Sequence, residues 1–159
     1  MRNFVEIGLG IIIAFLLYTI IGKISFSLSQ LLNFFTLAVI YFAVAKGELY
    51  GACIGTVSGL IQDSFSLGVF GVSGLSKTLI GFLAGLVAQK INILPLMRNF
   101  LFIFVLISGE TAVSIFLYYF ISAEYVSEIT PFILFQPLCT AVLGSAIFFL
   151  LRKFKVLSS

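Results

Sequence analysis

The chain has 159 residues, of which 61% are hydrophobic and 9% are charged, with a mean hydropathy of +1.23 and a formal net charge of +3. Soluble domains are about 45–50% apolar and about 25% charged, and a globule this small could not hide so much apolar surface from water. The composition therefore excludes a soluble domain and predicts a single all-α membrane domain over residues 1–159.

Six apolar stretches are predicted to be transmembrane helices, each of which needs about 20 mostly apolar residues. In chain order they cover residues 4–21, 28–45, 47–61, 74–88, 100–121 and 132–151. Arg2 and the first stretch have the outline of a signal peptide, but no Ala-x-Ala cleavage pattern follows, so this stretch is expected to stay as a helix. The third and fourth stretches are short, and the apolar segment that joins them is expected to dip into the bilayer.

The lysines and arginines predict the orientation of these helices. Six crossings place both termini on one side, and seven basic residues fall on that side: Arg2, Lys46, Lys90, Arg98, Arg152, Lys153 and Lys155. Only Lys23 and Lys77 fall on the other side. Basic residues concentrate in cytoplasmic loops, so both termini are predicted to be cytoplasmic. The net positive charge thus describes a membrane topology and does not indicate nucleic-acid binding.

Glycines repeat every fourth residue through the third stretch, at Gly47, Gly51, Gly55 and Gly59. This spacing puts them on one helix face over about 18 Å. Small residues let helix backbones approach closely in lipid, and Gly81 and Gly85 give the fourth stretch a similar face. We therefore expect the third and fourth helices to pack on each other. A homodimer surface is the alternative use of such a face.

Two acids are predicted to lie within the membrane, where an ionisable group costs about 2.5–3.5 kcal/mol and is a candidate functional site. Asp63, beside Gln62, ends the third helix, and Glu110 lies near the middle of the fifth. Lys77 is the cation nearest to Asp63 in sequence, so we predict that these two interact across the loop and that exchanging their charges rescues single-charge variants. The alternative is that both acids only lock helices together, with no ligand.

Two further features concern the fifth and sixth helices. Glu110, Ser114 and Tyr118 form a polar stripe at helical spacing, which is expected to face protein or a water-filled cavity rather than lipid. Pro137, after Gln136, interrupts the sixth helix and is expected to allow a kink at a packing position.

Catalysis is not expected. The chain has no histidine, Asp63 is its only aspartate, and the two cysteines, Cys53 and Cys139, lie inside predicted helices without a metal-ligand spacing. The sequence thus predicts a protein that is not an enzyme and that uses no metal and no cofactor.

The chain resembles the bacterial rod shape-determining protein MreD family over its whole length. The resemblance is most specific in GLIQDSFSLGVFGVSGL, where Gly59, Asp63, Gly68 and Gly71 match the family's pattern of glycine, aspartate and later glycines. An acid in the fifth helix, Gln136–Pro137 in the sixth and the basic end RKFK agree with the family's order of features.

This resemblance implies a non-enzymatic, multi-pass scaffold in the bacterial inner membrane that supports side-wall peptidoglycan synthesis. Its implied partner is MreC, and through MreC it connects to MreB, RodA and a class B penicillin-binding transpeptidase. The family fold is similar to substrate-binding subunits of energy-coupling-factor transporters, which implies an outward-facing pocket near Asp63. The candidate pocket or partner-binding residues are Gln62, Asp63, Gly68, Gly71, Lys77 and Glu110. A small-molecule-binding subunit of such a transporter is the alternative function.

Overall fold

The computed structural model describes residues 2–24, 32–65, 69–90, 95–121 and 131–153. All regular structure in these ranges is helical. The helices are α1 (Arg2–Ile24), α3 (Phe34–Lys46), α4 (Glu48–Phe65), α5 (Val72–Lys90), α6 (Leu96–Ile121) and α7 (Pro131–Lys153). The all-α prediction is confirmed, and each predicted stretch corresponds to one described helix. The largest difference is at the start of α3, because the predicted helix began at residue 28 and residues 28–31 lie outside the described ranges.

Two of these helices are long and apolar enough to cross a membrane by themselves, α5 and the Met97–Ile121 part of α6. Shorter apolar stretches occur in three others, at Gly8–Ile20, Phe34–Lys46 and Phe135–Leu150. α3 has 13 residues and is therefore about 20 Å long, which is less than the hydrocarbon thickness of about 30 Å.

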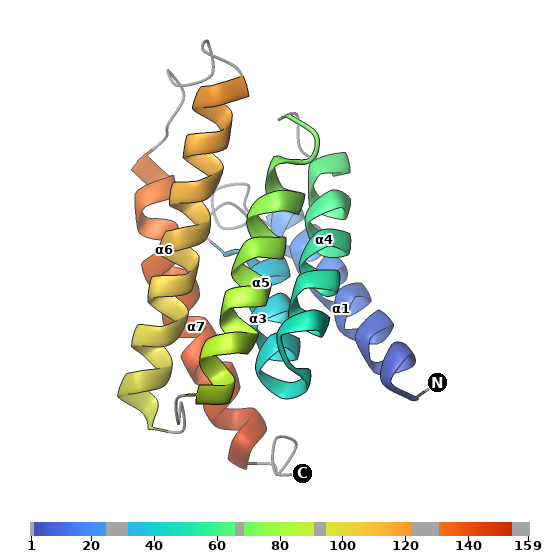
Figure 1. Ribbon diagram of the computed structural model, residues 1–159, viewed down its shortest axis with the longest axis vertical. Coiled ribbons are helices and arrows are strands. Elements are labelled where there is room, and N and C mark those ends of the chain that lie inside the picture. The colour runs from blue at the N-terminus through green and yellow to red at the C-terminus, as the bar shows by residue number, and fades with distance from the viewer. Residues whose placement is uncertain (1, 25–31, 66–68, 91–94, 122–130, 154–159) are drawn as a thin grey trace.

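The helices form one bundle in which α4 and α5 run side by side (Figure 1). α1 crosses the bundle obliquely beside α3, and α6 and α7 pack together on the side opposite to α1. The start of α1 and the end of α7 lie toward the same end of the bundle (Figure 1). The end of α3, the start of α4, the end of α5 and the start of α6 also lie toward this end.

The core of the bundle is built around α3. Eight of its 13 residues are buried, and they point in several directions around the helix: Phe34, Phe35, Thr36, Leu37, Val39, Ile40, Phe42 and Ala43. A helix that is apolar on all sides is surrounded by other helices. The main core cluster joins α3 to α5, α6 and α7 and contains Leu37, Ile40, Ala43, Ile80, Ala84, Ile103, Leu106, Ile107, Ala141 and Phe148.

The outer surface of the bundle is apolar over several helices. On α1 the exposed side chains are Leu9, Ile12, Ile13, Leu16, Leu17 and Ile20, and on α6 Phe116, Tyr119 and Phe120 are more than half exposed. Soluble monomers rarely expose contiguous apolar patches of this extent. This surface is suited to contact with lipid.

The predicted close packing of the glycine faces is confirmed for α4 and α5. A Cβ placed on Gly51, Gly55 or Gly59 would come within 3.0 Å of the α5 backbone, at Gly81, Lys77 and Gly74 respectively. Real Cβ contacts are essentially never this short, so only glycine permits the observed approach. The glycine face of α4 packs against α5 within one molecule, so a homodimer is not needed to explain it.

Gly47 has a different role from the other glycines of the row. It does not belong to α4 but ends α3, with φ of 99° and its N–H bonded to the carbonyl of Ala43. Glycine is the residue that adopts this left-handed conformation at no steric cost. The row of four therefore contains one turn residue and three packing residues.

Candidate functional site

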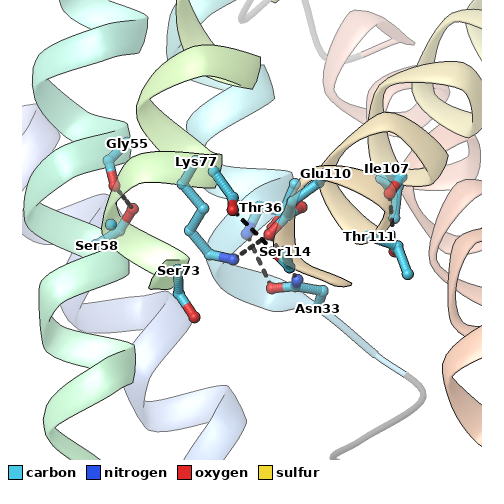
Figure 2. A network of polar contacts seen from close by, with 12 residues as sticks. Asn33, Thr36, Gly55, Ser58, Ser73, Lys77, Ile107, Glu110, Thr111 and Ser114 are labelled. Atoms are coloured by element: carbon cyan, nitrogen blue, oxygen red, sulfur yellow. Dashed lines mark hydrogen bonds and ion pairs between the residues drawn. The ribbon is translucent and has the colours of Figure 1, made fainter. Parts of the chain in front are cut away.

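A buried ion pair joins α5 to α6. The ammonium of Lys77 contacts Oε1 of Glu110, and the two side chains are only 1% and 6% exposed. Figure 2 shows Lys77 extending from α5 toward Glu110. The prediction that Asp63 is the partner of Lys77 is wrong, because this lysine lies on the α5 face that packs against α6 and α3.

Asn33 connects this ion pair to two more helices. It caps the N-terminus of α3, where its side-chain oxygen accepts a hydrogen bond from the N–H of Thr36 at 3.2 Å. Its amide Nδ2 donates to Glu110 Oε1 at 3.2 Å, and its backbone N–H donates to Thr140 Oγ1 on α7 at 3.3 Å. Asn33 thus caps α3 with one end of its side chain and donates a hydrogen bond to the Glu110 carboxylate with the other.

A second polar contact joins α5 to α6 one helical turn beyond Glu110. The hydroxyl of Ser114 donates to that of Ser76 at 3.0 Å, and Ser76 is completely buried. The prediction that the stripe containing Glu110 and Ser114 faces protein is therefore confirmed, and Tyr118 is half-buried. We use the name polar centre for the set Asn33, Thr36, Ser76, Lys77, Glu110, Ser114 and Thr140.

The polar centre holds four helices together and shows no feature of a catalytic or metal site within the described residues. Its two charges cancel, and its hydrogen bonds link α3, α5, α6 and α7. Within the described ranges no group of three His, Cys, Asp or Glu residues could hold a metal ion. Breaking a buried pair is far more costly than the pair is stabilising, so this arrangement favours one specific packing of the helices.

Asp63 makes a separate cap at the start of α5, where α4 ends. Its Oδ2 accepts hydrogen bonds from the N–H groups of Gly71 at 2.9 Å and Gly74 at 3.2 Å, and Oδ1 accepts from Ser73 at 3.3 Å. A carboxylate at a helix N-terminus satisfies free N–H groups and interacts favourably with the helix dipole. Although it lies on α4, Asp63 thus caps α5.

Two neighbours of Asp63 were also candidate site residues. Gly71 has φ of 98°, which allows the chain to turn back toward the Asp63 carboxylate before α5 begins. Gln62 is half-buried, and Gly68 lies outside the described residues. A pocket at this end of the bundle stays a prediction.

Replacing Asp63 with alanine is expected to destabilise the protein by about 1–2 kcal/mol, because three N–H groups lose their acceptor. Asp63→Asn, which keeps one acceptor oxygen, should lose less. Cys53→Ala is the control, because Cys53 lies exposed on the same helix and should change the stability by less than about 0.5 kcal/mol. Thermal unfolding in detergent measures the difference, and equal stability of the Ala variants would contradict the capping role.

The candidate site residues predicted from the sequence fall into two separate groups in the structure, and one of these groups includes residues that were not predicted. Lys77 and Glu110 come together, whereas Asp63 and Gly71 form the separate cap. Sequence reasoning missed the residues that join the ion pair to α3 and α7, above all Asn33. The available signal was a pair of polar residues three positions apart, Asn33 and Thr36, in an otherwise apolar helix. Pro137 is buried inside α7, as expected of a packing position.

Comparison with known families identifies the chain. A family model described as rod shape-determining protein MreD matches residues 2–154, which is nearly the whole sequence. No curated protein and no solved structure shows significant similarity to the chain. The match agrees with the apolar helices and with the resemblance seen around Asp63. The chain belongs to the MreD family, whose members are non-enzymatic membrane proteins that determine rod shape.

Proposed function

We propose that this protein is an inner-membrane scaffold and regulatory subunit of the cell-elongation complex, which binds MreC and supports side-wall peptidoglycan synthesis. Through MreC it would act with MreB, RodA and a class B penicillin-binding transpeptidase. The observation that carries the proposal is the family match over residues 2–154. The internal use of the buried charges supports it, because Lys77, Glu110 and Asp63 all hold helices together.

The proposal includes six membrane spans with both termini in the cytoplasm. The excess of basic residues on one side supports this orientation, as does the position of the start of α1 and the end of α7 at one end of the bundle (Figure 1). Asp63 and the α4–α5 connection would then face the envelope side. Mapping tag accessibility in intact cells checks the orientation, and a tag beside Asp63 that is reached only from the cytoplasm would contradict it.

Affinity purification in mild detergent tests the partner. Tagged protein is expected to recover MreC, with an unrelated tagged multi-pass protein as the control for non-specific capture. Recovery of transporter ATPase subunits without MreC would contradict the scaffold function and favour a small-molecule-binding transporter subunit. The Gly8→Ala variant is a suitable second bait, because an added Cβ there meets nothing within 4 Å and the bundle should be unchanged.

A further inference from the structure

Two buried oxygens of the polar centre have no hydrogen-bond partner within the described residues. They are Oε2 of Glu110 and Oγ1 of Thr36. Thr36 is completely buried and Glu110 is 4% exposed, so bulk solvent does not reach them in this conformation. Buried polar atoms in folded proteins are nearly always paired with protein or with ordered water. These two atoms therefore point to an additional small group in the polar centre.

Both atoms belong to residues that Asn33 already connects. Asn33 accepts from the Thr36 N–H with its side-chain oxygen and donates to the other oxygen of the Glu110 carboxylate. Figure 2 shows Thr36, Glu110 and Lys77 gathered around Asn33, where the start of α3 meets α5 and α6. Neither the Thr36 hydroxyl nor Glu110 Oε2 has a hydrogen-bond partner, and one group placed between them would supply both missing hydrogen bonds.

The charges of the site determine which group fits. Lys77 already neutralises Glu110, so a further ion of either sign would bring an uncompensated charge into a buried region. A carboxylate oxygen accepts hydrogen bonds only, whereas a threonine hydroxyl both donates and accepts. The occupant is thus small, neutral and able to donate a hydrogen bond.

We propose that an internal water molecule binds between Glu110 Oε2 and Thr36 Oγ1 and links α6 to α3. Such a water donates to the carboxylate and exchanges a second hydrogen bond with the threonine hydroxyl. The Lys77 ammonium carries three N–H donors, of which one points to Glu110 Oε1, so it supplies a further donor. Buried waters make about three hydrogen bonds on average, which matches this set. The inference does not depend on the partner proposed above.

Water-edited solid-state NMR of the full chain in bilayers with deuterated acyl chains tests this site. Protein labelled on threonine, glutamate and isoleucine is used, and Glu110→Gln and Thr36→Val assign the two signals by their loss. Magnetisation from water should reach Glu110 Cδ and Thr36 Cβ several-fold faster than it reaches Ile107. Ile107 is the matched control, because it lies on α6 one turn before Glu110 and is completely buried.

The variants distinguish a shared water from separate ones. In Thr36→Val the transfer to Glu110 should fall to the level of Ile107, whereas Thr36→Ser, which keeps the hydroxyl, should retain it. Transfer to Glu110 and Thr36 no faster than to Ile107 in the unmodified protein would overturn the proposal, whatever the folding of the variants. Unchanged transfer to Glu110 in a folded Thr36→Val protein would overturn the shared site.

Discussion

Replacing Lys77 with methionine is expected to destabilise the folded protein by about 3–5 kcal/mol, because the Glu110 carboxylate stays buried without its counter-ion. Glu110→Gln should have an effect of similar size, since it strands the ammonium group instead. The double variant Lys77→Met/Glu110→Gln should be more stable than the sum of the two losses predicts, because it leaves neither charge alone. Thermal unfolding in detergent, read by size exclusion of a fluorescent fusion after heating, measures the three variants.

Lys23→Met is the control for this cycle. Lys23 is an exposed lysine near the end of α1, so its loss removes a charge without opening a buried pair. It should change the stability by less than about 0.5 kcal/mol. If the stability losses of the two single variants simply add in the double variant, Lys77 and Glu110 do not interact, and their ion pair does not hold α5 and α6 together.

Gly55→Ala is expected to destabilise the protein by about 1–3 kcal/mol, and Gly55→Val by more, because both overpack the α4–α5 contact. The atoms in the way belong to the α5 backbone at Lys77 and Thr78, and backbone cannot rotate aside as a side chain can. The helices must then separate, and the displaced segment is the one that carries Lys77. Both variants should therefore also weaken the ion pair with Glu110.

Gly8→Ala is the matched control for this prediction. An added Cβ at Gly8 on α1 meets nothing within 4 Å, and alanine is the better helix former, so the stability should stay equal or rise slightly. The same thermal assay compares the two positions. A Gly55→Ala protein as stable as the Gly8→Ala protein would contradict the close approach of α4 and α5.

The helices and the α4–α5 contact could be predicted from the sequence because both follow from local patterns. Long apolar runs predict membrane helices, and Gly51, Gly55 and Gly59 at four-residue spacing mark a face where side chains are missing. The position of Asp63 at the end of the third helix was also predicted, and there its carboxylate accepts a hydrogen bond from the Gly71 N–H. In each case the interacting groups lie on consecutive segments of the chain, α4 and α5 with the turn between them.

The polar centre could not be predicted in the same way, because its partners are distant in sequence. Lys77 is closer to Asp63 along the chain, but the bundle turns it toward Glu110 on the next helix. Thr140 is 107 residues from Asn33, and only the placement of α7 beside α3 brings them together. Helix spacing predicts which residues share a face of one helix, but it does not predict which helix that face meets.

The separation of Lys77 and Glu110 has a consequence for synthesis. The two residues are 33 positions apart, so a ribosome that adds about 5–20 residues per second delivers the acid about 2–7 s after the lysine. During that interval α5 carries an ammonium group that α6 cannot yet neutralise. A lysine at the centre of a membrane helix costs about 2.5–3.5 kcal/mol, so insertion of α5 together with α6 is favoured over insertion of α5 alone.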